Sequence, residues 1–192
     1  MATTEPIRDK KQIQAMANYY LKQGKIRNYL LIVMGVHTGL RVSDLLRLRR
    51  GDVYDFGRGE FRSHLALTEQ KTGKTKTIAL NSRVLSALAL CFGGDFGCAE
   101  DVLFPNNRKK RAAIGRVQAW RIVKMAAEAV GVAARVGVHG LRKTMGYHLW
   151  KAGVQAVLLM DIFNHSSFDV TRRYLGITQD ERDGVYLGLA LV

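Results

Sequence analysis

The spacing of apolar residues changes along this chain, and this change limits the possible folds more than any other feature. Over residues 9–48 and again from residue 82 onward, apolar residues recur every three or four positions, which is the period of an amphipathic helix. The segments 61–67 and 75–80 lie between these regions and are strand-like. The sequence therefore predicts a mainly α-helical, α+β fold with one small antiparallel sheet.

Local signals set the expected ends of the helices. Gly39 follows an apolar-periodic segment and is expected to end a helix there, because glycine readily takes the left-handed backbone conformation. We expect helices over residues 9–22, 27–38, 43–48, 82–92, 115–130, 140–152, 155–163, 169–174 and 179–189. On the helix at 115–130, the side expected to be buried carries Val117, Trp120, Val123, Ala127 and Val130.

The expected sheet has three antiparallel strands. The segments 61–67 and 75–80 would pair across the turn Lys71-Thr72-Gly73-Lys74. Val53 and Tyr54 would add a third strand through a turn at Gly57 and Gly59.

Length and composition indicate one folded domain. A chain of 192 residues is about one domain long, and neither an internal repeat nor a low-complexity linker divides it. Apolar residues make up 47% of the chain and only two residues are proline, which excludes a disordered basic tail. Cys91 and Cys98 have neither a zinc-site spacing nor a disulfide framework around them, so we expect reduced thiols and no metal.

Basic residues outnumber acidic ones by a wide margin. The 30 Lys and Arg residues against 16 Asp and Glu residues give a formal net charge of +14, which indicates a polyanionic partner such as nucleic acid or an anionic membrane. A membrane-spanning helix needs about 20 residues, whereas the longest apolar runs, 29–36 and 185–192, have eight each. The N-terminal segment also does not resemble a secretory signal peptide, because charged residues occupy the stretch where the apolar region of such a peptide would begin. We therefore expect a cytoplasmic protein that binds no membrane.

The positive charge is concentrated in one stretch of the sequence. Between Val102 and Met160 the only acidic residue is Glu128. This block predicts a surface that follows phosphates, although such residues also solvate ordinary helix faces. The basic residues of the block are Arg108, Lys109, Lys110, Arg111, Arg116, Arg121, Lys124, Arg135, Arg142, Lys143 and Lys151.

Six side chains that could carry chemistry follow one another along the chain. Each alone has an ordinary explanation, such as a surface ion pair or a hairpin lysine. As a set they fit phosphoryl transfer without a metal: two guanidinium groups hold phosphate oxygens, imidazoles move protons, and a lysine protonates the leaving oxygen. A tyrosine hydroxyl, with an ordinary pKa of about 10, is the nucleophile and needs positive surroundings. The set is Arg41, Lys71, His139, Arg142, His165 and Tyr174.

Four short motifs contain these residues. They are Thr38–Leu48 around Arg41, Gln70–Lys74 around Lys71, His139–Thr144 with His139 and Arg142, and Asn164–Ser167 with His165, followed by Tyr174 nine residues after His165. Their order and spacing resemble the tyrosine recombinases, or phage-type integrases, over nearly the whole chain.

The resemblance implies a role for each residue. Tyr174 attacks a DNA phosphate and forms a 3′-phosphotyrosyl enzyme with a free 5′-hydroxyl, while Arg41 and Arg142 hold the non-bridging oxygens. Lys71 acts as general acid for the 5′-oxygen. The two histidines, His139 and His165, contact the phosphate and assist proton transfer, and Asp44 orients the active-site groups. A 5′-hydroxyl from another strand reverses the step, so neither ATP, a metal nor another cofactor is required.

The resemblance also implies an organisation and a set of partners. Residues 1–192 correspond to a single catalytic domain without the N-terminal core-binding domain of most relatives, and 179–192 either exchanges between protomers or packs on its own domain. The expected partners are double-stranded DNA, further copies of the chain in a tetramer on DNA, and an accessory DNA-bending protein, at the bacterial nucleoid or on mobile-element DNA. The residues expected to contact DNA are Lys74, Arg108, Lys109, Lys110, Arg111, Arg116 and Lys143.

One departure from the family pattern concerns the histidine of the last motif. Phe163-Asn164 stands where relatives often have Leu-Gly. Because asparagine adopts the left-handed conformation more readily than most residues, we expect Asn164 to replace the glycine there.

Other interpretations stay open or fail. A type IB topoisomerase-like enzyme would use the same groups, and a catalytically silent DNA-binding module would need only the basic block. The sequence after Lys71 is similar to the end of a phosphate-binding P-loop, but Thr68 stands where the first glycine is needed. Tyr147 and Tyr186 are rival nucleophiles, of which the first belongs to an apolar helix and the second lies too far beyond His165.

Overall fold

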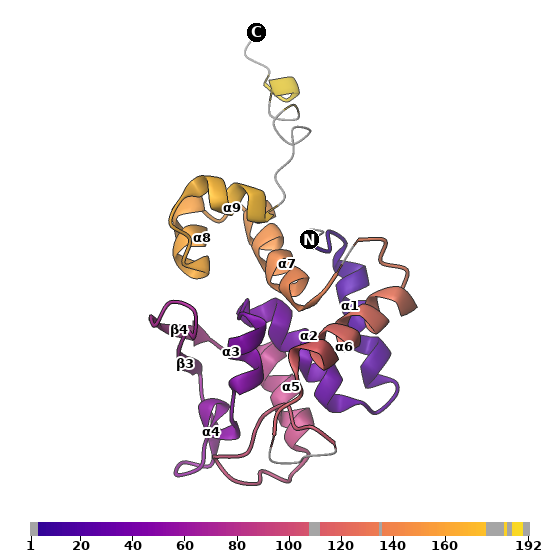
Figure 1. Ribbon diagram of the computed structural model, residues 1–192, viewed down its shortest axis with the longest axis vertical. Helices are drawn as coiled ribbons and strands as arrows, with labels where there is room; N and C mark the ends of the chain where they lie inside the picture. Colours follow the sequence, from indigo (N-terminus) through magenta and orange to yellow (C-terminus); the bar gives the residue numbers. More distant parts are fainter. Residues whose placement is uncertain (1–3, 108–111, 135, 176–182, 184–185, 190–192) are drawn as a thin grey trace. The chain divides into compact units, whose positions relative to one another are not determined.

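Helices dominate the computed structural model of this protein, as the spacing of apolar residues predicts (Figure 1). The structure describes residues 4–107, 112–134, 136–175, 183 and 186–189. It divides into two units, Met1–Met145 and Gly146–Val192, here named the large unit and the small unit.

The helices of the large unit begin and end close to the predicted positions. The side chain of Asp9 accepts a hydrogen bond from the backbone of Lys11 and so caps the first helix. Gly39 ends the second helix with a φ of 59°, in the left-handed conformation, as predicted. The helices are α1 (Lys10–Leu21), α2 (Ile26–Thr38), α3 (Val42–Arg47), α4 (Arg50–Val53), α5 (Ser82–Phe92), α6 (Arg116–Ala129) and α7 (Val138–Lys151), the last of which continues into the small unit.

Helix α2 is the centre of the large unit. It packs against α1, α3, α5 and α6, and its residues 30–35 are all buried. The hydroxyl of Tyr20 in α1 donates a hydrogen bond to the carbonyl of Ile122 in α6 over 2.7 Å, and burial raises the pKa of Tyr20 to about 12. Burial of apolar side chains therefore stabilises this part of the fold, and the hydrogen bond from Tyr20 to Ile122 connects α1 with α6.

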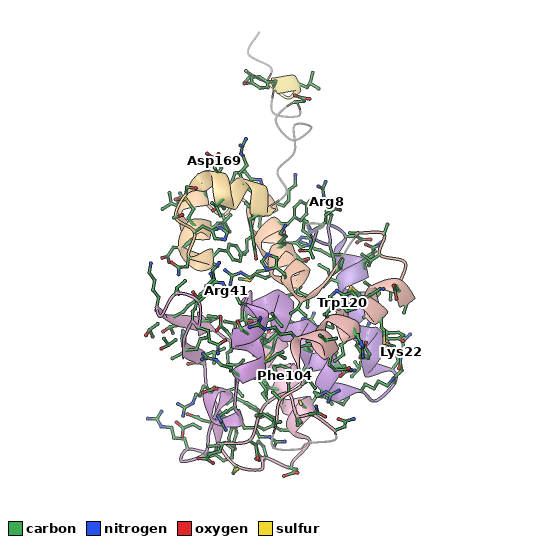
Figure 2. All side chains as sticks on the ribbon, viewed as in Figure 1. Arg8, Lys22, Arg41, Phe104, Trp120 and Asp169 are labelled. Atoms are coloured by element: carbon green, nitrogen blue, oxygen red, sulfur yellow. The ribbon has the colours of Figure 1, made fainter. Side chains whose placement is uncertain are left out.

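The prediction for the buried side of α6 was partly wrong. The stripe that packs into the core is made of Ala119, Ile122, Val123, Ala126 and Ala127. The predicted members Val117 and Trp120 are instead 63% and 46% exposed, and Trp120 projects from α6 (Figure 2). The alanine side chains on this stripe are small and allow α6 to pack closely against the core. The prediction instead placed the larger apolar residues Val117 and Trp120 on the buried side.

The predicted three-stranded sheet is also wrong in one respect. The described residues form two separate two-stranded antiparallel sheets. The chain changes partner between its second and third strands: the backbone N–H of Arg62 donates to Val53, whereas the carbonyl of Ser63 accepts from Leu80. The strands are β1 (Tyr54–Asp55), β2 (Glu60–Phe61), β3 (His64–Thr68) and β4 (Thr75–Ala79), paired β1 with β2 and β3 with β4.

The small unit holds the end of α7 together with α8 (Ala156–Phe163) and α9 (Phe168–Leu175), close to the predicted ranges. Its buried core is formed by Leu159, Phe163 and Leu175. A Cβ atom at Gly146 in α7 would lie 2.8 Å from Leu175 and 3.0 Å from Phe163, so the absent side chain leaves room for this packing.

Two further predictions fall in or beyond the small unit. Asn164 ends α8 with φ 51° and ψ 51°, which confirms the predicted left-handed conformation. Of the predicted helix 179–189, and of the segment 179–192 expected to exchange, only residues 183 and 186–189 are described. Within the described part of the chain, no helix is long and apolar enough to cross a membrane.

Candidate functional site

Arg41 lies at the junction between α2 and α3. It is the residue that precedes the first turn of α3, with extended backbone angles, and its side chain is 20% exposed (Figure 2). One terminal nitrogen, Nη1, lies 2.6 Å from Oε2 of Glu69. This ion pair fixes one edge of the guanidinium group.

Arg142 is held against the end of the same helix. Arg142 belongs to α7 and is only 2% exposed. Its Nη1 donates a hydrogen bond over 2.5 Å to the carbonyl of Gly39, the residue that ends α2. The approach of α7 to α2 depends on Gly35, where a Cβ atom would lie 2.6 Å from Leu141. The left-handed turn at Gly39 is therefore close to both arginines, since Arg41 follows it by two residues.

His139 lies one turn before Arg142 on α7. His139 is an exposed residue whose ring is only partly desolvated. This desolvation lowers its pKa, and the positive charges of Lys143, Arg142, Arg41 and Lys71 lower it further, to about 4. The imidazole is therefore neutral at pH 7. The influence of Arg41 and Lys71 on this ring also shows that residues about 70 to 100 positions apart along the chain share one positive field.

Lys71 lies in the turn between β3 and β4. The turn is closed by two backbone hydrogen bonds, from the N–H of Glu69 to the carbonyl of Lys74 and from the N–H of Gly73 to the carbonyl of Glu69. Gly73 has a φ of 66°, a conformation that suits glycine. Lys71 is exposed in this turn.

Asp44 links α3 to this turn. It is 1% exposed, and its Oδ1 accepts a hydrogen bond from the backbone N–H of Gln70 over 3.0 Å. Arg47 lies 3.9 Å from the same oxygen. The Asp44 carboxylate thus links the Lys71 turn to α3, which Figure 1 shows next to the β3–β4 hairpin. Its orienting role stays a prediction.

Sequence reasoning missed Glu69. This residue is 2% exposed and contacts both Arg41 and the turn. A usable signal was present, because a carboxylate two positions before Lys71 at the end of a strand lies beside a group of cations that needs a buried counter-charge.

His165 and Tyr174 belong to the small unit and lie together there. Their rings are 4.8 Å apart between centroids, in an edge-to-face arrangement. Nδ1 of His165 lies 3.0 Å from the hydroxyl oxygen of Thr171, and that hydroxyl is also within 3.3 Å of the carbonyl of Ser167. If the hydroxyl donates to Ser167, it accepts from Nδ1–H, and Nε2 of His165 becomes the acceptor nitrogen.

The six predicted residues therefore fall into two groups. Arg41, Lys71, His139 and Arg142 share the positive field of the large unit. His165 and Tyr174 form the aromatic pair of the small unit.

The residues predicted to contact DNA are placed differently from one another. Arg108, Lys109, Lys110 and Arg111 lie outside the described residues. Lys74 and Arg116 are exposed.

Lys143 is in a different position from these two exposed residues. It is 6% exposed, and its ammonium group donates to the carbonyl of Thr4 over 2.8 Å. Burial lowers the pKa of Lys143. Together with a hydrogen bond from the N–H of Ile7 to Thr144, this contact holds the N-terminal segment against α7.

The sequence is similar to known integrases. The model of the phage integrase family matches residues 8–181. A probable integrase/recombinase, YoeC of Bacillus subtilis, is 34% identical over 186 residues, which cover 97% of each chain. The tyrosine recombinase XerA of Pyrococcus furiosus is 25% identical over 158 residues, which cover 82% of this chain and 53% of the relative. Apart from YoeC, the chain spans about half the length of such relatives.

Solved structures share the fold. A crystal structure of XerA recombinase matches with a TM-score of 0.74 and 20% identity over 96% of this chain and 65% of the other. The XerH site-specific recombinase bound to its difH substrate, in a pre-cleavage complex, matches with a TM-score of 0.72 and 17% identity over 96% of this chain and 55% of the other.

Proposed function

Because this chain belongs to the phage integrase family, we propose that it is a tyrosine-type site-specific DNA recombinase. It cleaves a DNA strand through a 3′-phosphotyrosyl intermediate and rejoins that strand to another. The observation that supports this most is that Arg142 donates to the carbonyl of Gly39, two residues before Arg41, where these arginines and Lys71 produce a positive field that lowers the pKa of His139. Such a field stabilises the negative charge that develops on a phosphate during transfer.

In the proposed reaction, Arg41 and Arg142 bind the non-bridging oxygens of one DNA phosphate. The guanidinium group suits this role because it is planar, keeps its charge and offers several donors in a fixed geometry. Arg142 already donates to Gly39 and Arg41 already pairs with Glu69. Both groups are therefore oriented before the phosphate arrives, which lowers the cost of ordering them.

The hydroxyl of Tyr174 attacks the phosphorus and displaces the 5′-oxygen. Lys71 donates a proton to that oxygen as it leaves. His139, which is neutral at pH 7 because of its low pKa, hydrogen-bonds to the phosphate without adding a further charge. His165, with Nδ1–H engaged by Thr171, accepts at Nε2 the proton that the hydroxyl of Tyr174 loses as it attacks. The phosphotyrosine keeps the bond energy, so a 5′-hydroxyl from another strand reverses the step without ATP.

The proposed partner is double-stranded DNA. The family relatives XerH and lambda integrase were solved bound to DNA, and this chain has a formal charge of +14. We assign phosphate contacts to the exposed Lys74 and Arg116 and to residues 108–111. Lys143 is left out of this set because its ammonium group is buried against the N-terminal segment. We further propose a tetramer on DNA, exchange of segment 179–192, an accessory DNA-bending protein, and a cytoplasmic location at nucleoid or mobile-element DNA.

A nicked suicide substrate tests the function directly. Cleavage next to the nick releases a short fragment, so the covalent protein–DNA adduct accumulates and is seen on a denaturing gel. We expect the wild-type chain to form the adduct on DNA from the ends of the mobile element that encodes it, and Tyr174→Phe to form none. Tyr147→Phe is the matched control and should form the adduct. A wild-type chain that forms no adduct on such DNA contradicts the proposal.

A second assay separates recombination from nicking and closing. A recombinase joins strands from two sites and needs several copies of the chain. Relaxation of a supercoiled plasmid that lacks a specific site, by a monomer, would instead indicate a topoisomerase-like enzyme.

A further inference from the structure

Glu69 connects the Lys71 turn to Arg41 through its side chain. The carboxylate is buried, with 2% exposure. Its Oε2 lies 2.6 Å from Nη1 of Arg41 and accepts a hydrogen bond from the hydroxyl of Thr72 over 2.8 Å. One oxygen atom thus contacts the guanidinium group and the residue next to Lys71.

The backbone of Glu69 also closes the same turn. Its N–H donates to the carbonyl of Lys74 over 3.0 Å, and its carbonyl accepts from the N–H of Gly73 over 2.9 Å. Glu69 therefore holds both ends of the segment that carries Lys71, and its side chain cannot move without disturbing the contact between the turn and Arg41.

Asp44 provides the reciprocal link. Its buried carboxylate belongs to α3 and accepts from the backbone of Gln70 in the turn, whereas the carboxylate of Glu69 belongs to the turn and binds Arg41 at the start of α3. A buried carboxylate is costly unless it is paired and hydrogen-bonded. Two of them across the same junction indicate that the spacing between α3 and the turn is closely defined.

We propose that Glu69 is a positioning residue that couples the Lys71 turn to Arg41, so that one carboxylate sets both the phosphate-binding guanidinium and the leaving-group acid. The inference rests on the proposed function and adds a residue to the same site. Thr72 transmits the coupling to the turn. Glu69 itself does not touch the reacting atoms.

A modified substrate separates the effect of Glu69 on Lys71 from its effect on Arg41. A DNA strand with sulfur in place of the bridging 5′-oxygen releases a thiolate, which leaves without the proton that an alkoxide needs. Such a 5′-phosphorothiolate substrate therefore removes the requirement for Lys71 but keeps the requirement for Arg41. Single-turnover cleavage rates on the ordinary and the sulfur-containing strand separate the two effects.

Three variants give distinct expectations. Lys71→Ala should lose about 10²-fold or more on the ordinary strand, in the range of general acid catalysis, and should recover on the sulfur-containing strand. Thr72→Val should lose about tenfold on the ordinary strand and recover in the same way, because it disturbs only the turn side of the link. Glu69→Gln should lose about 10²-fold and recover only in part, because Arg41 also loses its ion pair.

The control is Glu60→Gln. Glu60 lies in β2, and its side chain is 63% exposed in an ion pair with Arg58, so its replacement should change neither rate. Thermal unfolding of each variant verifies folding. If Glu69→Gln is poorly folded, Thr72→Val carries the test.

Each outcome decides the inference. Equal rates for wild type, Glu69→Gln and Thr72→Val on the ordinary strand would overturn the coupling while the proposed function stands. Equal losses of Glu69→Gln on both strands, with normal Thr72→Val, would limit Glu69 to Arg41 and would also overturn it. A wild-type chain that cleaves neither strand would instead contradict the proposed function.

Discussion

The two units hold their candidate residues by different kinds of interaction. In the large unit, Arg41 and Arg142 are fixed by charged and polar partners, Glu69 and the carbonyl of Gly39. In the small unit, the rings of His165 and Tyr174 pack edge to face with centroids 4.8 Å apart, and a single hydrogen bond, between Nδ1 of His165 and Thr171, adds to this packing. Ion pairs and hydrogen bonds fix the direction of a group, whereas ring packing leaves more freedom along the surface of the ring.

The units also differ in how much core supports these residues. The large unit is built around the buried helix α2 and contacts from α1, α5 and α6. Among the described residues, the small unit has three fully buried apolar side chains, Leu159, Phe163 and Leu175. A smaller core gives lower local stability. The arginines proposed to bind phosphate are thus on the better-supported unit, and the proposed nucleophile is on the more weakly supported one.

The largest expected effect on the difference in local stability comes from removing the Phe163 ring, which is in the core of the small unit. Phe163 is 0% exposed, and its ring lies 5.2 Å from that of Tyr174 and 5.7 Å from that of His165. We expect Phe163→Ala to cost about 3–5 kcal/mol of stability. Amide hydrogen exchange should show loss of protection in α8 and α9, with the large unit unchanged.

Phe104→Ala is the matched control in the large unit, since Phe104 is also 0% exposed. It should reduce protection in α2 and its neighbours. Equal loss of protection in both units after Phe163→Ala would show that they unfold as one and would remove the difference in local stability.

A second prediction concerns the direction of a guanidinium group in the large unit. Arg142→Lys keeps the charge but loses the planar set of donors, and we expect a loss of about 3 kcal/mol of transition-state stabilisation. That corresponds to a fall in cleavage rate of on the order of 10²-fold. The measurement is single-turnover cleavage, and Arg121→Lys on the exposed surface of α6 is the control. A rate near that of wild type would mean that charge alone suffices at this position.

A third prediction concerns the pH dependence of stability caused by His139. Its pKa is about 4 in the folded chain and about 6.5 when unfolded, so the unfolded state binds more protons between these values. Stability should therefore fall as pH decreases from about 6.5 to about 4. His139→Gln should flatten the slope of unfolding free energy in this window, and Arg41→Gln should raise the pKa of His139, measured by NMR titration. An unchanged His139 titration in Arg41→Gln would contradict the shared positive field.

Local chemistry made several features predictable from the sequence. The ends of α1 and α2 follow from Asp9 and Gly39, whose preferences act within a few residues. Asn164 takes the expected left-handed conformation for the same reason. The family motifs also placed six candidate residues in order, and their roles stay predictions.

Features that depend on distant parts of the chain were harder to predict. The sheets separate at Arg62 and Ser63, where the backbone N–H of Arg62 pairs with Val53 and the carbonyl of Ser63 pairs with Leu80, two residues nearly thirty positions apart. The exposed position of Trp120 depends on which side of α6 faces the core. Glu69 stands two positions before Lys71, which was a usable signal, but its partner Arg41 lies 28 residues earlier in the chain and only the fold brings the two together.

The left-handed turn at Gly39 connects the two arginines. Arg142 binds the carbonyl of Gly39, and Arg41 follows Gly39 by two peptide units, or at most about 7 Å of chain. The link between the two arginines thus consists of one hydrogen bond and two peptide units. A change in the backbone conformation of Gly39 would therefore disturb the positions of both arginines at once.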